Sequence, residues 1–86
     1  MNKISQKRLE WACRRGMLEL DVLLGNFLRE AYPKLSSDDQ ELFVHLLEEN
    51  DQDLFLWLTG KEIHENFEMN KIIEMVRYHA KNRHVT

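Results

Sequence analysis

Residues 14–21 have the sequence RRGMLELD, and this stretch decides the fold because it separates two amphipathic helices. The two arginines suit the negatively charged end of one helix dipole, and Glu19 and Asp21 suit the positively charged start of the next. Glycine commonly ends a helix in the left-handed conformation. The sequence therefore predicts a tight turn between two helices, with Gly16 as its left-handed residue. We call residues 14–21 the corner.

Upstream of the corner, the sequence predicts a first helix from about residue 5 to residue 15. Trp11 lies on a stripe between Arg8 and Arg15, at the expected edge of the core. The arc expected to face the core comprises Leu9, Ala12, Cys13 and Gly16.

Downstream of the corner, a second helix begins near Met17 and ends before Pro33, because proline disfavours helical geometry in the preceding residue. Gly25 inside this helix costs about 1 kcal/mol relative to alanine, which suggests a close crossing with another helix. The apolar stripe of the helix consists of Leu20, Leu23, Leu24, Phe27, Leu28 and Ala31.

Three further short helices complete the chain. A capping box that begins at Ser37 opens the third helix, and Asn50 or Asp51 caps the fourth, which Gly60 ends. The last helix spans about residues 67–81 and buries an apolar stripe of Ile72, Ile73 and Val76, with His79 or Ala80 beside it. Because the spacing is helical throughout, the sequence predicts an all-α fold, a compact five-helix bundle with short connections.

The composition fits a single small domain over residues 1–86. Of these residues 43% are hydrophobic and 31% charged, and three glycines and one proline are too few for a β-sandwich. No stretch is apolar enough to cross a membrane, and the N-terminus does not resemble a secretory signal. Because Cys13 is the single cysteine, no intramolecular disulfide can form, and we expect a cytoplasmic protein without membrane insertion.

Charge is distributed unevenly along the chain. Residues 1–15 hold five basic side chains and one acidic one, residues 36–68 hold ten acidic and one basic, and residues 69–86 hold four basic and one acidic. Either the basic ends fold back against the acidic middle, or the protein has two binding faces of opposite charge. The formal net charge of −3 argues against a dedicated binder of duplex DNA.

Two short motifs resemble metal sites but lack the required ligands. Residues 64–68 read HExxE, whereas a zinc protease needs a second histidine at the fifth position. Residues 51–53 begin like a calcium loop, but Phe55 and Leu56 stand where a ligand and a glycine are needed. Cys13 lies on the core arc with no histidine near it in sequence, so we expect a buried structural thiol. The sequence predicts no catalytic residue and no metal site.

Trp11 and its basic neighbours have three interpretations. The ring can stack on a nucleic-acid base or a flavin. It can instead pack at the edge of the core beneath arginine stems, or be a hot spot of a protein interface, where tryptophan and arginine are enriched.

Residues 7–21 resemble the signature of the SdhE/YgfY family of flavoprotein assembly factors. The core of that signature is RGxxE, which Arg15, Gly16 and Glu19 match, preceded here by the sequence WACR. The resemblance continues in residues 51–58, DQDLFLWL, and covers the chain from about residue 3 to residue 80.

The resemblance implies a five-helix bundle that promotes covalent attachment of FAD to the flavoprotein subunit of succinate dehydrogenase, and in some bacteria of fumarate reductase. We call this flavoprotein the client. The family has no catalytic centre of its own, so the resemblance implies a protein that is not an enzyme and binds no cofactor stably. It implies catalysis by positioning, because the client and the flavin perform the chemistry.

The resemblance also indicates which residues contact the client. Gly16 lets the client backbone approach closely, and Arg15 and Glu19 supply paired polar contacts. The full set of expected client-binding residues is Arg8, Trp11, Arg14, Arg15, Gly16, Met17, Glu19 and Asp21.

Two other functions remain open from sequence alone. One is a regulatory nucleic-acid-binding protein that uses the basic first helix, although the acidic middle of the chain argues against it. The other is an antitoxin-like partner of a toxin. In every case we expect a monomer when the chain is free.

Overall fold

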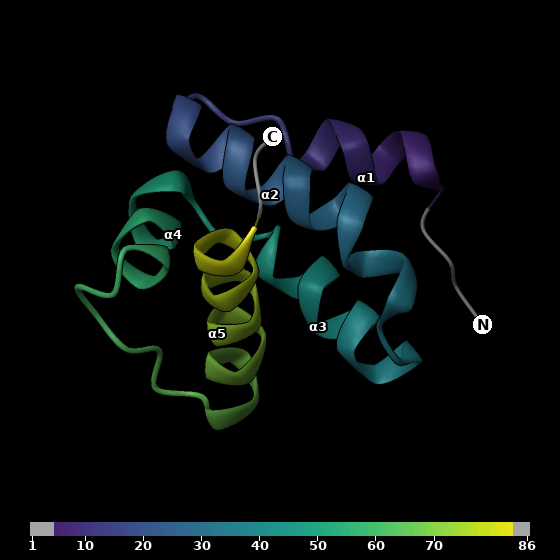
Figure 1. The fold of residues 1–86 in the computed structure, drawn as a ribbon. Helices are drawn as coiled ribbons and strands as arrows, with labels where there is room; N and C mark the ends of the chain where they lie inside the picture. The colour runs from purple at the N-terminus through teal and green to yellow at the C-terminus, as the bar shows by residue number, and fades with distance from the viewer. Residues whose placement is uncertain (1–4, 84–86) are drawn as a thin grey trace.

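The structure, a computed structural model, describes residues 5–83, and all of its regular elements are helices (Figure 1). Five α-helices and no β-strand occur in this range, which confirms the predicted all-α bundle. Within it, no helix combines the length and the apolar character needed to cross a membrane. In chain order the elements are α1 (Gln6–Ala12), α2 (Leu18–Glu30), the 3-10 turn η1 (Tyr32–Lys34), α3 (Ser37–Leu46), α4 (Asp51–Leu58) and α5 (Phe67–Asn82).

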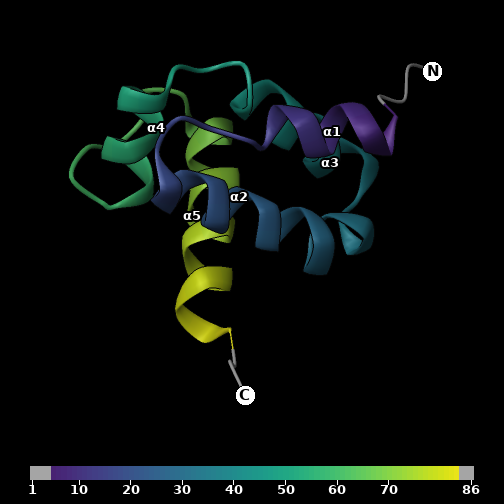
Figure 2. The same ribbon diagram turned by 90° about the horizontal axis from the view of Figure 1, so that it is seen from above.

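Helix α5 is the centre of the bundle, because it contacts α2, α3 and α4. Figure 1 shows α3 and α4 on either side of α5, with α1 and α2 above them, and Figure 2 shows α2 running across α5. Phe27 of α2 lies where the helices meet, with its ring centroid 5.1 Å from that of Phe43 and 5.5 Å from that of His79. The predicted apolar stripes of α2 and α5 supply half of the buried core residues. Leu9 and Cys13 come from the α1 side, and the rest come from α3, α4 and the connection between them.

Helix ends follow local signals at two of the predicted positions and one residue away from a third. Asn50 caps α4, because its side chain accepts a hydrogen bond from the Asp53 N–H at 2.8 Å. Gly60 ends that helix with a φ of 80°, as predicted. The cap of α3 is Ser36, whose hydroxyl accepts from the Asp39 N–H at 3.2 Å, so the predicted cap at Ser37 is wrong by one residue.

Two predictions about glycine are wrong. Helix α1 ends at Ala12, about a turn before Gly16, and Gly60 is the only residue between 5 and 83 with positive φ. Gly16 is therefore not the left-handed end of α1. A Cβ built on Gly25 would meet the guanidinium of Arg29 in the same helix at 3.3 Å, so this glycine does not mark a close helix crossing.

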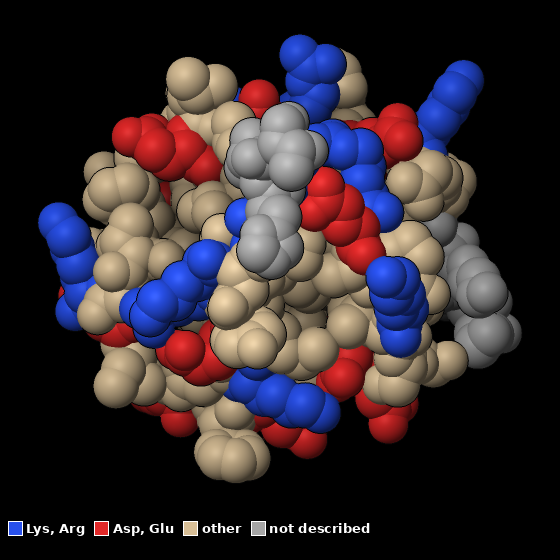
Figure 3. Space-filling model, in the orientation of Figure 1, with Lys and Arg blue, Asp and Glu red and all other residues tan. Residues whose placement is uncertain are grey.

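The two basic ends of the sequence pair with its acidic middle. Arg15 pairs with Asp51 at 3.4 Å, and Lys71 of α5 pairs with Asp39 of α3 at 3.0 Å. Figure 3 shows lysine and arginine side chains lying among acidic ones over one face of the molecule. These contacts support the interpretation in which the ends fold back against the middle.

Candidate functional site

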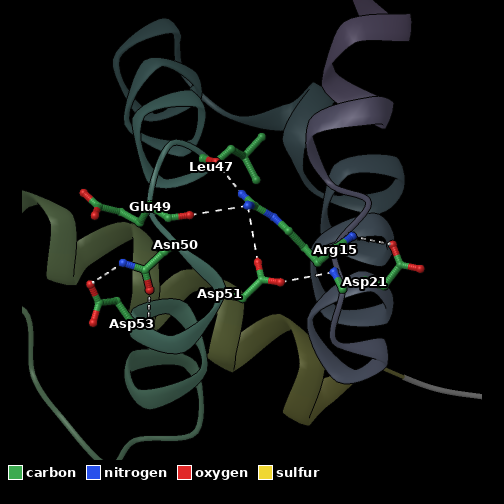
Figure 4. Close-up of polar contacts among 8 residues, drawn as sticks. Arg15, Asp21, Leu47, Glu49, Asn50, Asp51 and Asp53 are labelled. Atoms are coloured by element: carbon green, nitrogen blue, oxygen red, sulfur yellow. Dashed lines mark hydrogen bonds and ion pairs between the residues drawn. The ribbon is translucent and has the colours of Figure 1, made fainter.

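The corner is fixed by the side chain of Arg15, which turns into the molecule (Figure 4). Its guanidinium donates hydrogen bonds to the carbonyl oxygens of Leu47 and Glu49, the latter at 3.4 Å. These carbonyls follow α3, so the positive charge lies at the negatively charged end of that helix. Only 15% of the side chain is exposed, and its Nε is buried without a hydrogen-bond partner among the described residues. The inward position of Arg15 thus depends on the contacts of its terminal nitrogens.

Asp51, the first residue of α4, holds both the side chain and the backbone of the corner. Its Oδ1 lies 3.4 Å from Nη1 of Arg15, and its Oδ2 accepts a hydrogen bond from the Gly16 N–H at 3.1 Å. On the other side, the Arg15 N–H donates to Oδ1 of Asp21 at 3.4 Å. The connection between α1 and α2 is therefore tied to the connection between α3 and α4 (Figure 4).

The outward side of the corner carries three of the other predicted residues, which are Arg14, Gly16 and Glu19. Gly16 and Glu19 are exposed, whereas Met17, which precedes α2, is half-buried. Arg15 and Glu19 form no ion pair with each other, because Arg15 faces Asp51. The structure thus separates the RGxxE motif into an anchored arginine and an exposed glycine and glutamate.

Trp11 lies on the surface and not at the edge of the core. Its side chain is 75% exposed, and the Arg14 guanidinium lies 5.9 Å from the centroid of the ring. Arg15 does not flank the ring as the helical wheel predicted, because α1 has ended before this residue. Arg8 and Trp11 line a shallow hollow on α1 of about 330 Å³.

Two exposed apolar residues, one within the motif and one three positions after it, were not predicted from the sequence. Leu18 is 72% exposed and Val22 is 51% exposed, one turn apart on α2. Val22 also lines, with Arg14, a hollow of about 500 Å³ between α1 and α2. Both residues lie off the apolar stripe of α2, and this was the signal that could have identified them. We call the exposed set the corner surface, which comprises Arg8, Trp11, Arg14, Gly16, Leu18, Glu19 and Val22.

The role of Asp51 at the corner was also missed, because the sequence suggests for this residue only a helix cap, the start of an incomplete calcium loop and a part of the family resemblance. Its partner Arg15 is 36 residues away in the chain, and no local pattern links the two. In the described part of the chain, no group of three histidine, cysteine or acidic residues is placed to hold a metal ion. The chemistry that the corner offers is recognition through hydrogen bonds, charge and apolar contact.

Cys13 is 2% exposed, as expected for a structural thiol, and burial raises its pKa from 9.0 to about 11 against the opposing effect of Arg15. At pH 8 the fraction present as thiolate should be ~100-fold lower than in the unfolded chain. We expect a thiol reagent to label Cys13 far more slowly in native buffer than in denaturant. Because the folded state holds this proton more tightly, the free energy of unfolding should fall as the pH rises from 9.0 to about 11. Rapid stoichiometric labelling of the native protein would contradict this assignment.

Comparison with known proteins gives a consistent result. Residues 7–80 match the family described as flavinator of succinate dehydrogenase. A protein described as FAD assembly factor SdhE in Colwellia psychrerythraea is 49% identical over 74 residues, which cover 86% of this chain and 81% of the relative. A protein of the same description in Shewanella oneidensis is 44% identical over 80 residues, which cover 93% of this chain and 98% of that relative. The solution structure of a UPF0350 protein matches with a TM-score of 0.77 at 40% identity, covering 96% of this chain and 89% of that chain.

Proposed function

The chain belongs to the family of succinate dehydrogenase flavinators, and from this we propose that it is an FAD assembly factor. It binds the flavoprotein subunit of succinate dehydrogenase and promotes the covalent attachment of FAD. We extend the proposal to the flavoprotein of fumarate reductase as a second client. FAD is the substrate that the client acquires, and the chain itself holds no flavin stably.

Gly16 is the observation that best supports this proposal. It is exposed, its φ is not positive, and a Cβ built on it would lie 3.4 Å from Oδ2 of Asp51, an ordinary van der Waals contact. Nothing within the described fold therefore requires glycine at this position. The missing side chain instead leaves the backbone of the corner open to close approach by the client.

The proposed mechanism is positioning of the client. Arg15 and Asp51 keep the corner in one conformation, so the client does not have to order it on binding. Glu19 offers a charged acceptor beside the open backbone of Gly16, and Trp11 offers a large apolar contact. The chain contributes no reactive group and is, in this proposal, not an enzyme. We place its action in the cytoplasm, where an unpaired thiol such as Cys13 stays reduced, and we expect the free chain to be a monomer.

The test is reconstitution with purified components. We expect the wild-type chain to stimulate covalent flavin attachment to the apo client, measured as flavin fluorescence of the denatured client. Glu19→Ala should lower the initial rate ~10-fold, because a charge-assisted hydrogen bond to the client is lost. Glu41→Ala, at an exposed position on α3, is the matched control and should match the wild type.

Circular dichroism must show that both variants are folded. If Glu19→Ala retained the full rate, its role at the interface would be refuted. If the wild-type chain gave no stimulation with either flavoprotein, the proposed function itself would be wrong.

A further inference from the structure

The connection between α4 and α5, residues 59–66, and the first residue of α5 present two large apolar side chains to solvent. Ile63 is 84% exposed, and Phe67, the first residue of α5, is 85% exposed. They are the two most exposed large apolar side chains between residues 5 and 83, ahead of Trp11 at 75%. Exposed apolar residues of this size commonly mark an interaction surface, and these two lie four positions apart in the chain.

Hydrogen bonds hold this connection in a defined conformation. The His64 N–H donates to Oδ1 of Asn70 at 2.9 Å, and Nδ1 of its ring accepts from the Asn66 N–H at 2.9 Å. The His64 ring lies against Trp57, with 4.5 Å between the ring centroids. Inward packing of His64 therefore leaves Ile63 facing outward, and a partner would not have to order the connection before binding.

Three glutamates are the near neighbours in sequence of the two apolar residues. Glu62, Glu65 and Glu68 are all exposed, and none of them forms an ion pair with any residue between 5 and 83. The neighbouring Lys61 lies over the ring of Phe55, 5.8 Å from its centroid. Apolar anchors accompanied by polar or charged residues are the usual composition of a protein interface. We call Glu62, Ile63, Glu65, Phe67 and Glu68 the loop surface.

The loop surface is separate from the corner surface. Asp51 at the beginning of α4 binds Gly16, whereas the connection follows Leu58 at the other end of the same helix. In Figure 1 the start of α2 lies above α4 and the connection lies below it. A partner that engages both surfaces must extend along α4.

We propose that the loop surface is a second contact for the client flavoprotein, and that it binds a segment with apolar side chains flanked by lysine or arginine. This inference rests on the proposed function. The unpaired carboxylates favour a basic polypeptide and disfavour nucleic acid or an anionic lipid surface. The α1 helix of a second copy has similar chemistry, with Lys7, Arg8 and the exposed Trp11, so self-association is an alternative outcome of the test.

The affinity of the full chain for the purified apo client tests this inference. The double variant Ile63→Ser with Phe67→Ser should raise the Kd ~10-fold, since interface anchors of this size dominate binding. Replacing the three glutamates with glutamine should weaken binding at low salt and reduce its dependence on ionic strength. Tyr78→Ser is the matched control, because Tyr78 is 70% exposed on α5 and lies outside both surfaces.

A photocrosslinking residue in place of Ile63 identifies the segment that is bound. A crosslink to a lysine- or arginine-rich segment of the client supports the inference. Unchanged affinity in the double variant, or an equal loss in Tyr78→Ser, overturns it. A crosslink between two copies, with client affinity unchanged, assigns the surface to self-association and also overturns it. If the wild-type chain does not bind the client, the proposed function fails as well, whereas normal wild-type binding confines the failure to this inference.

Discussion

Gly16→Arg is expected to lower the rate of covalent flavin attachment at least ~100-fold while the chain remains folded. The arginine side chain would occupy the space through which the client approaches the backbone of the corner. A loss of about 3 kcal/mol of binding free energy corresponds to a factor of ~100. The fold should tolerate the change, because Gly16 is exposed and its φ is not positive. The measurements are client affinity, flavin fluorescence of the denatured client, and thermal unfolding of the variant.

Gly16→Ala separates the effect of bulk from the effect of any side chain. Its Cβ would lie 3.4 Å from Oδ2 of Asp51, which requires no rearrangement of the corner. We therefore expect near-normal stability and a rate between those of the wild type and Gly16→Arg. A folded Gly16→Arg variant with the wild-type rate would show that the client does not approach the corner at this residue.

Asp51→Ala is expected to lower the free energy of unfolding by about 2 kcal/mol and the rate of flavin attachment by up to ~30-fold. The variant leaves the Gly16 N–H and the largely buried guanidinium of Arg15 without their carboxylate. The apparent affinity falls with the population of the competent conformation, and a loss of about 2 kcal/mol can reduce that population by at most ~30-fold. Denaturant unfolding and the reconstituted reaction measure the two effects.

Asp39→Ala is the control for a general loss of stability. It breaks the ion pair with Lys71 between α3 and α5, which is not part of the corner. The variant should lose stability but keep the rate of flavin attachment at a temperature where it is folded. If Asp51→Ala and Asp39→Ala had equal effects on the rate, Asp51 would have no special role in positioning the corner.

The sequence predicted the bundle because the signals that specify its helices are local. The apolar stripes of α2 and α5 face the core as their spacing indicates, and Asn50 and Gly60 bound α4 as their residue types favour. At the start of α3, the predicted helix boundary is wrong by only one residue. The one-residue error at the start of α3 arises because Ser36 and Ser37 are adjacent and equally suitable as caps.

The corner could not be predicted in the same way because its conformation depends on distant residues. The guanidinium of Arg15 finds its acceptors 32 to 36 residues later in the chain, and these contacts draw the chain out of the helix before Gly16. A helical wheel assumes that the helix continues, and so it placed Trp11 between Arg8 and Arg15. The composition of the motif was informative about function, but its geometry is set by tertiary contacts.

Helix α1 is seven residues long, well below the length at which an isolated helix persists in water. A synthetic peptide with the sequence of residues 5–21 would therefore contain the whole RGxxE motif without its shape, because the acceptors that orient Arg15 belong to residues 47–51. Grafting the motif onto another helical hairpin would fail for the same reason. An inhibitor or mimic of this protein has to reproduce the connection before α4 together with the motif.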